Sequence, residues 1–423
     1  MSLDSALLIF LIVFTMLVGV EIVAVIGLSA IGLTLLSGTL PLANFGITAF
    51  ESLNSTPFIA LPLFVLTGTL ILKSGIADQL VRFAKSLVGT LPGGLAVTSL
   101  VACGFFAAIS GSNSATVATI GQIMLPRMDN DNYPRSFTLA TVAAGGTVGV
   151  IIPPSIVFIL YGVATGVSVS ALFLAGIIPG ILMVVAMSVV AVWAGARNGW
   201  GTRVPVSFSE VGRAAWETKW AAIAIFIILG GIYGGVFTPT EAAAVSAIYC
   251  LAIGLFVTRQ IGWRDLPSML ASSAHVTGII APIIAVSLIL SQAFAILGFA
   301  DVFVSGLTGL STDPTLLLLL TMLVILITGC FLEATPALLI LSPLFSPLVS
   351  TMEMSPVHFG VVMVVGLTIG FITPPMGLNL FVASSIGQTP MHGIVRHTFA
   401  YLVVLFLVWL AIAFWPALSL ALL

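Results

Sequence analysis

One stretch of the sequence occurs twice, as GTVGVIIPPS at 146–155 and as LTIGFITPPM at 367–376. At a constant offset of 221 positions, both copies place Thr, Gly, Ile and a Pro-Pro pair in register. A Pro-Pro pair breaks a helix and frees backbone carbonyls. Lipid cannot solvate those carbonyls, so a break inside an apolar segment has to be buried in protein or line a site. Matching breaks in two halves favour a transporter's binding centre over two proline kinks that only shape packing.

The composition around these breaks is that of a membrane protein. Sixty per cent of the residues are hydrophobic and 6% are charged, whereas soluble domains carry about 25% charged residues. A net charge of −2 offers no basic patch for phosphates, so no nucleic-acid partner is expected. The cysteines and histidines are scattered, so we expect no disulfide, no cofactor and no metal other than sodium. The first apolar run has no basic region before it, so we expect it to be retained.

The predicted fold is an all-α polytopic membrane protein. Each predicted span is close to the ~20 residues that a bilayer requires. Two further apolar stretches, 92–126 and 314–349, are interrupted halfway by small or polar residues, and we interpret them as re-entrant hairpins. Residues 5–37 could form one steep helix in place of two spans. The ten predicted spans are 5–18, 21–37, 55–72, 137–162, 168–195, 219–236, 240–258, 276–296, 357–387 and 397–420.

The distribution of charge supports this layout, because Lys and Arg concentrate on the cytoplasmic side of membrane proteins. Threading the spans puts all 12 Lys and Arg residues on one face. Both termini then lie on the periplasmic side, the first hairpin opens from the cytoplasm, and the second opens from the exterior. The two halves therefore have opposite orientation, as in inverted-repeat transporters that work by alternating access. The opposite face receives Asp4, Glu51, Glu241, Asp301, Asp313 and Glu353.

The repeat predicts three parts of the chain. The first inverted repeat, 1–196, contains scaffold spans 5–72, the hairpin 92–126 and the broken span 137–162. A polar cytoplasmic linker covers 197–218. The second repeat, 219–423, contains scaffold spans 219–296, the hairpin 314–349 and the broken span 357–387. Before the first hairpin, LVRFAKSLVG at 80–89 has the pattern of a helix along the membrane interface, or it is an ordinary loop.

The tip of the first hairpin, SGSNSAT at 110–116, is rich in small residues with hard oxygen ligands. Alkali and alkaline-earth cations accept hydroxyl, amide and carbonyl oxygens. If the tip meets the break at 149–154, unwound carbonyls and side-chain oxygens could together surround one sodium ion. The alternative is tight helix packing, with Ser and Thr bonded back to their own helices.

The tip of the second hairpin, 328–336, would meet the break at 370–376 and form a second ion site. Glu333 is the one carboxylate that this layout places within the membrane, where an ionisable group is a functional candidate; the alternative is a snorkelling residue at a misplaced hairpin end. The tips offer mostly neutral oxygens, so sodium fits better than calcium or magnesium. A small anionic substrate could sit between the tips, at half-helix N-termini. Asn379 is a further ligand contact or makes a helix–helix hydrogen bond.

Several motifs in order resemble the large permease subunit of tripartite ATP-independent periplasmic (TRAP) transporters of the C4-dicarboxylate type, and the resemblance runs from end to end. It implies a sodium-driven secondary transporter of the bacterial inner membrane with an elevator movement. It also implies a soluble periplasmic binding protein that delivers an organic acid and a small four-helix membrane subunit. The motifs are SGSNSATVATIGQIMLP, GTVGVIIPPSIVFILYG, VSVSALFLAGIIPG, GGIYGGVFTPTEAAAV, FLEATPALLILSPLF and GFITPPMGLNLFVAS.

The resemblance also assigns site residues, most of which would act through backbone carbonyls. The family often has Asp where this chain has Glu333, and Ala or Ser where it has Asn113. The first sodium site is assigned to Ser110, Asn113, Gly149, Ile152 and Pro154, and the second to Gly329, Gly370, Thr373 and Met376. The substrate candidates are Ser112, Glu333, Thr335 and Asn379.

The function expected from these features is import of a small organic acid, a C4-dicarboxylate or a related carboxylate, by a binding-protein-dependent transporter. The alternative is a self-sufficient sodium- or proton-coupled anion carrier of the wider inverted-repeat class. An intramembrane enzyme would need a grouping of Ser, His and an acid at membrane depth, and no such motif appears. A channel is disfavoured because hairpins of opposite entry suit alternating access better than a continuous pore.

Overall fold

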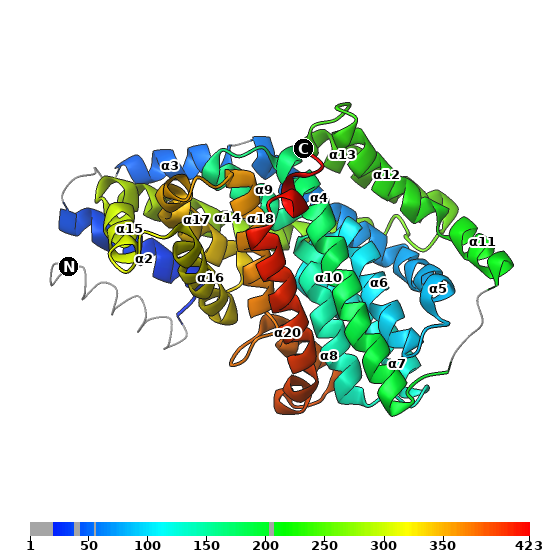
Figure 1. Cartoon of the computed structure of the whole chain (residues 1–423). Helices are drawn as coiled ribbons and strands as arrows, with labels where there is room; N and C mark the ends of the chain where they lie inside the picture. The colour runs from blue at the N-terminus through cyan, green and yellow to red at the C-terminus, as the bar shows by residue number, and fades with distance from the viewer. Residues whose placement is uncertain (1–19, 38–42, 55, 203–206) are drawn as a thin grey trace.

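The computed structural model describes residues 20–37, 43–54, 56–202 and 207–423, and these residues form helices and no β-strand (Figure 1). The predicted all-α class is therefore confirmed. The predicted span 5–18 lies outside the described residues, and so does the choice between one helix and two over 5–37.

The first half contains one hairpin and one broken helix. Its first described helices are α2 (Ile22–Ser37), α3 (Ala43–Leu53) and α4 (Thr56–Lys73), and α5 (Ile76–Val88) follows α4 at a bend of 73°. The hairpin consists of α6 (Gly94–Ser110) and α7 (Asn113–Asp129). The broken helix consists of α8 (Arg135–Gly146), the 3-10 turn η1 (Thr147–Val150) and α9 (Ile156–Thr165), and α10 (Val169–Asn198) ends the half.

The second half repeats this order. It begins with α11 (Phe208–Glu217), α12 (Lys219–Tyr233), α13 (Pro239–Ala252) with the π-turn η2 (Ile253–Val257), α14 (Leu266–Ile296) and α15 (Phe299–Thr308). The hairpin is α16 (Pro314–Phe331) and α17 (Ala334–Thr351), and the broken helix is α18 (Pro356–Gly370) and α19 (Leu378–Gly387). The chain ends with α20 (Met391–Phe414) and α21 (Ala417–Leu420).

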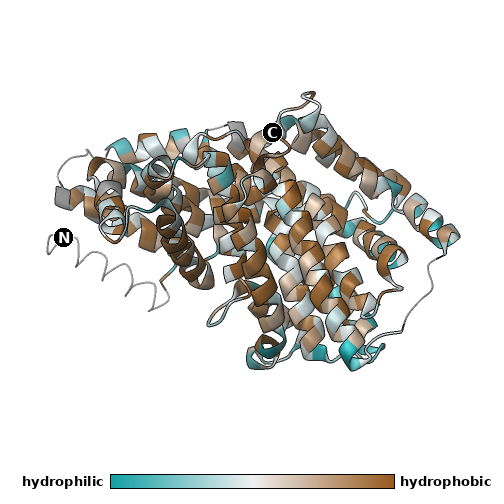
Figure 2. Ribbon diagram, viewed as in Figure 1, coloured by the Kyte–Doolittle hydropathy of each residue, from teal (hydrophilic) through white to brown (hydrophobic). Residues whose placement is uncertain are grey.

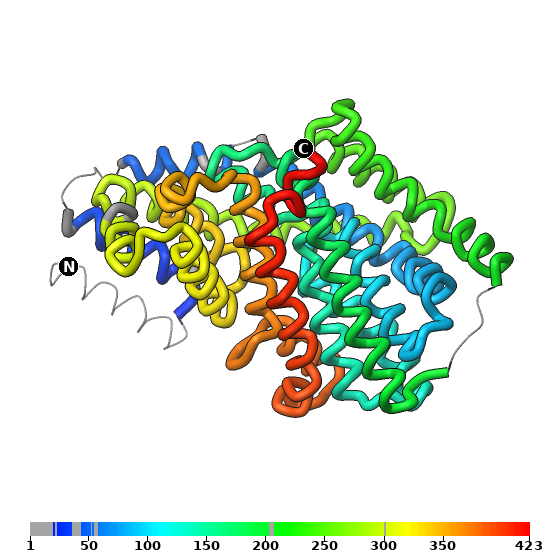
Figure 3. Tube along the Cα trace, viewed as in Figure 1, coloured from blue at the N-terminus to red at the C-terminus, as the bar shows by residue number. Residues whose placement is uncertain are grey.

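The helices form two neighbouring groups, whose paths Figure 3 traces. In one group, α4 packs against α13 and α14, and α14 also packs against α2, α3 and α17. In the other, α6 packs against α5, α7, α8 and α10, and α20 packs against α8, α10 and α18. Figure 2 shows that hydrophilic residues gather at one end of this second group, around the α7–α8 turn and the start of α20. The predicted cytoplasmic residues Arg127 and Arg135 belong to that end.

Three helices and the bounds of two others differ from the prediction. α14 begins at Leu266 and not at 276, α20 covers Met391–Phe414 and not 397–420, and α11 occupies part of the predicted linker 197–218. α3 and α15 are not predicted at all. Polar residues such as Glu210 and Arg213 make α11 too polar to be recognised from the sequence as a membrane span. Its backbone hydrogen bonds form a helix nevertheless, because they do not require an apolar sequence. The segment 80–89 falls mostly within α5, which excludes an ordinary loop.

Among the described residues, six helices are long and apolar enough to cross a membrane, and two bent pairs raise this number to as many as eight. The chain is therefore an integral membrane protein by length and composition. The predicted span 21–37 and both broken spans consist of shorter helices, so the ten-span layout and its orientation stay predictions. The six helices are α10, Pro239–Val257, α14, α16, α17 and α20.

Candidate functional site

The tip of the first hairpin is a turn of one glycine and one serine. Gly111 has φ of 59°, and Ser112 begins α7 by accepting a hydrogen bond from Ala115 N at 3.4 Å. The left-handed region suits glycine. A side chain at Gly111 would also meet the Pro154 carbonyl oxygen at 2.7 Å. The first tip therefore lies directly against the first break.

Within the first broken helix, one hydroxyl group bridges the two sides of the break. Ser155 Oγ donates to Val150 O at 2.5 Å and accepts from Phe158 N at 3.2 Å, so it begins α9 and ties it to η1. On the other side, a Cβ at Gly149 would be 2.7 Å from Ser112 O. The break therefore faces protein backbone, which is the condition for unwound backbone at membrane depth.

The second hairpin and the second break make an equivalent contact. A Cβ at Gly370 on α18 would be 2.3 Å from the carbonyl carbon of Gly329 on α16. Beyond the break, Gly377 N donates to Cys330 O at 3.4 Å. Both Pro-Pro pairs are joined by cis peptide bonds. Each half thus has a glycine-mediated contact between a hairpin and a broken helix.

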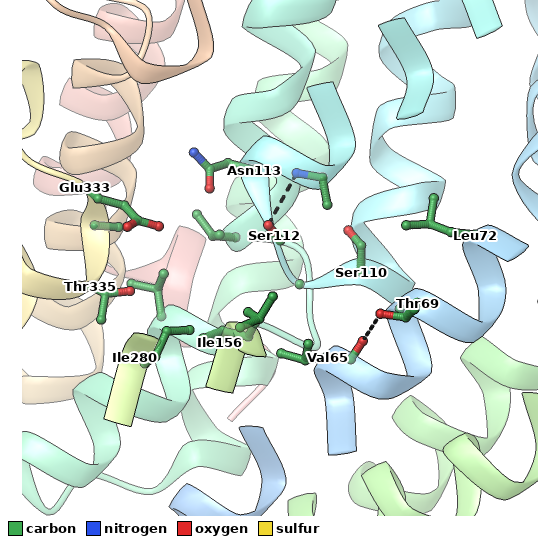
Figure 4. A pocket seen from close by; sticks show the side chains of 17 residues that line it. Val65, Thr69, Leu72, Ser110, Ser112, Asn113, Ile156, Ile280, Glu333 and Thr335 are labelled. Carbon is green, nitrogen blue, oxygen red and sulfur yellow. Dashed lines mark hydrogen bonds between the residues drawn. The ribbon is translucent and has the colours of Figure 1, made fainter. Parts of the chain in front are cut away.

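A cavity of about 200 Å³ lies between the two hairpin tips. Figure 4 shows Glu333 and Thr335, from the start of the second hairpin's outgoing helix, on one side, and Ser112 and Asn113 across from them. Helices α4, α9 and α14 complete the wall. The lining residues are Val65, Gly68, Thr69, Leu72, Ser110, Gly111, Ser112, Asn113, Ala115, Val150, Ile156, Val157, Val276, Ile280, Glu333, Ala334 and Thr335.

The electrostatics of the cavity come from helix ends and one carboxyl group. The starts of α7, α9 and α17 lie at the cavity, and helix starts offer free N–H groups and positive potential. Glu333 is solvent-accessible and is the one ionisable side chain among the described lining residues, none of which is Lys, Arg or His. The cavity can therefore hold a small polar molecule whose acid group is bound by helix starts rather than by a basic side chain.

Most residues assigned to the two ion sites are brought together. Ser110, Asn113, Gly149 and Pro154 lie at the contact of the first tip with the first break. The side chain of Ile152 does not join them, since it packs 2.5 Å from where a Cβ of Gly180 on α10 would be. Only its backbone is suited to an ion.

At the second contact, the two glycines touch and Thr373 follows the end of α18. The Thr373 hydroxyl donates to Ile369 O at 2.8 Å and also interacts with the Cys330 side chain, and its oxygen has two lone pairs with which it can accept a hydrogen bond or bind a cation. The Met376 side chain is 49% exposed, so here too the backbone is the better ligand.

Of the substrate candidates, Ser112, Glu333 and Thr335 line the cavity and Asn379 does not. The Asn379 amide is fully buried; it accepts from Asn113 Nδ2 at 3.0 Å and donates to Ala143 O at 3.1 Å. Of the two roles that the sequence leaves open for Asn379, the structure thus shows the helix–helix hydrogen bond.

Six lining residues come from helices for which the sequence predicts no site role, namely Val65, Gly68, Thr69 and Leu72 on α4 and Val276 and Ile280 on α14. Gly68 and Thr69 lie on α4, where a Cβ of Gly68 would be 3.7 Å from Ser110 Cα. A pair of small residues inside an apolar span indicates that another helix approaches closely. This is the sequence feature that could have identified Gly68 and Thr69 as lining residues. Ile280 on α14 carries no such signal.

The set of possible ligands at the two contacts suits a hard cation. It consists of carbonyl and hydroxyl oxygens with one amide, which are ligands for alkali and alkaline-earth ions and not for soft metals. Over the described ranges, no three His, Cys, Asp or Glu side chains gather as a metal site would require.

Apolar helices, two hairpins that meet two broken helices, and a cavity between the hairpin tips together define a membrane transporter subunit. The model of the family "Tripartite ATP-independent periplasmic transporter, DctM component" matches residues 8–418. The chain belongs to this family of TRAP large permease subunits and is a secondary transporter component, not an enzyme.

Relatives within the family are named for different substrates. The isethionate TRAP permease DctMQ of Oleidesulfovibrio alaskensis is 38% identical over 95% of this chain, which spans only 64% of that relative. The C4-dicarboxylate large permease DctM of Pseudomonas aeruginosa is 38% identical over 94% of this chain and 93% of its own length. The sialic acid large permease SiaM of Vibrio cholerae is 35% identical over 86% and 85%.

A solved structure shares the fold. The crystal structure of the YdaH transporter of Alcanivorax borkumensis aligns with a TM-score of 0.58 over 85% of this chain and 86% of that chain. The two sequences are 14% identical, so the likeness concerns the fold alone.

Proposed function

We propose that this chain is the sodium-coupled large subunit of a binding-protein-dependent importer of small organic acids, either C4-dicarboxylates or related carboxylates. The observation that carries the proposal is the cavity between the hairpin tips, with an oxygen-rich contact of hairpin and break on each side. Cations at these contacts would offset the charges of a bound acid and of Glu333. The relatives named for isethionate, C4-dicarboxylates and sialic acid support small organic acids as the class of substrate, and the last two names support a carboxylate.

The proposed movement is that of an elevator. The hairpin 92–126 with the broken span 137–162, and the hairpin 314–349 with the broken span 357–387, would move together as a transport domain. Backbone contacts at Gly149 and Gly370 favour this, because they leave no room for a hairpin to slide on its break. Scaffold spans 5–72 and 219–296 would stay fixed, and α4 and α14 supply their part of the cavity wall. Inverted repeats over 1–196 and 219–423, joined by 197–218, would give the two access states.

The proposed partners follow from the family. A periplasmic binding protein would deliver the acid, and a small four-helix membrane subunit would brace the scaffold in the bacterial inner membrane, with both termini of this chain periplasmic. The family description names a tripartite periplasmic transporter. The Oleidesulfovibrio relative is longer than this chain, which leaves room for a fused small subunit.

Sodium coupling through Thr373 is tested by replacing it with alanine. A host strain that lacks the chain, complemented with the wild-type or the variant chain, keeps its native partner proteins. We expect deletion to abolish uptake of at least one labelled acid among succinate, isethionate and sialic acid. Thr373→Ala should raise the sodium concentration for half-maximal uptake about ten-fold. The reason is that the ion loses one oxygen ligand, whose contribution to binding is about that of one hydrogen bond.

Thr398→Ala is the control, because the Thr398 hydroxyl likewise bonds back to its own helix, on α20, although Thr398 is fully buried and Thr373 is partly buried. It should leave the sodium dependence unchanged. Intact uptake with the wild-type sodium dependence in Thr373→Ala would refute the assignment. Sodium-dependent uptake that survives deletion of the periplasmic binding protein would instead favour a self-sufficient carrier.

A further inference from the structure

We infer that Asn379 is a positioning residue that couples the two candidate ion sites, so that filling one site raises the sodium affinity of the other. The inference rests on the proposed function, since it concerns the ions of that function. Asn379 belongs to the second half of the chain and is the second residue of α19, just beyond the second break. Its side chain nevertheless bonds to the first half, at Asn113 of the first candidate ion site and at Ala143 O.

The main chain of Asn379 is fixed by the second break. Its N–H donates to Phe371 O at 3.0 Å. Two residues earlier, Gly377 N donates to Cys330 O in the second hairpin at 3.4 Å. Thr373, whose oxygen is assigned to the second ion, lies inside the loop that these two bonds close. A shift of the second break on ion binding therefore moves Asn379.

The side chain of Asn379 is fixed by the first hairpin and the first broken helix. Its Oδ1 accepts from Asn113 Nδ2 at 3.0 Å, and its Nδ2 donates to Ala143 O on α8 at 3.1 Å. Asn379 is 0% exposed and Asn113 is 4% exposed, so water does not replace either bond. Close packing reinforces them, because a Cβ at Gly146 would be 3.1 Å from Asn379 Nδ2.

The bond also sets the orientation of the Asn113 amide. With its nitrogen donating to Asn379, the Asn113 amide keeps its oxygen on the side of the cavity that it lines (Figure 4). Water cannot take the place of either amide in this buried, low-dielectric interior. If one amide is displaced, the other is left without a hydrogen-bond partner. An ordered second break therefore holds the Asn113 oxygen in place at the first tip. Thermodynamic linkage makes this effect reciprocal, so ion binding at the first tip also stabilises the second break.

The test is a titration of the purified chain with sodium chloride, with choline chloride holding the ionic strength constant and the thermal unfolding midpoint as the readout. We expect a sigmoidal response in the wild type, with a Hill coefficient between about 1 and 2, the limit for two sites. Asn379→Leu should reduce the coefficient to about 1 and raise the half-saturating sodium concentration about ten-fold.

The control is another buried hydrogen bond between the halves. Thr141 Oγ1 and the Tyr401 hydroxyl lie 2.8 Å apart and join α8 to α20, away from both breaks. Tyr401→Phe should lower the midpoint and keep the wild-type Hill coefficient. Asn113→Ser removes the Asn379 bond from its other end, keeps an oxygen for the ion, and should give the same loss of cooperativity if Asn379→Leu does not fold.

A non-cooperative wild type, a cooperative Asn379→Leu or Asn113→Ser variant, or equal loss of cooperativity in Tyr401→Phe would each overturn the inference. Failure of the proposed function looks different, since sodium would then stabilise the wild type no more than choline does.

Discussion

Gly370→Ala is expected to lower acid uptake at least about ten-fold at equal amounts of the chain in the membrane. The added Cβ would be 2.3 Å from the Gly329 carbonyl carbon, whereas ordinary contacts lie at 3.4–4 Å. Both sides of this contact are backbone, so no side chain can rotate away. Overpacking of this kind costs about 1–3 kcal/mol or more, and here it also separates the second hairpin from the second break. Uptake in the complemented host strain, normalised to membrane-inserted protein, measures the effect.

Gly393→Ala serves as the control for this change. Gly393 lies in the first turn of α20, where an added Cβ would meet nothing within 4 Å. Alanine there should be neutral or stabilise the helix by up to about 1 kcal/mol. Wild-type uptake by Gly370→Ala would show that the hairpin and the break do not need to touch.

Ala115→Trp is expected to abolish uptake and to leave stabilisation by sodium in place. Ala115 lies in the first turn of α7 and lines the cavity between the hairpin tips. An indole side chain would fill much of a cavity of about 200 Å³. The ion ligands proposed at the two breaks would remain. Uptake in the complemented strain and sodium-dependent unfolding midpoints of the purified variant distinguish loss of the substrate site from loss of the fold.

A second cavity provides the matched control. Ala244 on α13 lines an apolar cavity of about 240 Å³ against α4 and α14, away from both hairpin tips. Ala244→Trp fills a space of similar size and should keep most of the uptake. If Ala115→Trp transported at the wild-type rate, the substrate would have to bind elsewhere.

The sequence predicts the hairpin tips and both breaks closely. The first tip and both breaks depend on residues that act on the backbone next to them, namely the Pro-Pro pairs, Gly111, and the capping Ser112 and Ser155. Their positions therefore do not depend on knowing how the helices pack.

The neighbours of the tips could not be predicted in this way. α14 has almost no amphipathic pattern, so its sequence does not indicate which face meets the cavity, and Ile280 is found only once the helices are placed. On α4, the small pair Gly68 and Thr69 indicates a close helix approach but not which helix approaches. The Asn113–Asn379 bond joins residues 266 positions apart, and neither side chain identifies its partner.

The most direct measurement of the central claim, that the halves are inverted copies around one cavity, is the labelling of two matched positions. Asn130 and Thr351 are both exposed and stand 221 positions apart; Asn130 directly follows α7 and Thr351 is the last residue of α17, so each lies at the end of a hairpin, before the broken helix. Each is replaced by cysteine in a chain whose three native cysteines are changed to alanine. A membrane-impermeant maleimide applied to spheroplasts should label Thr351→Cys at once, and Asn130→Cys only after the membrane is opened. Labelling of both variants from the same side of the membrane would contradict the account.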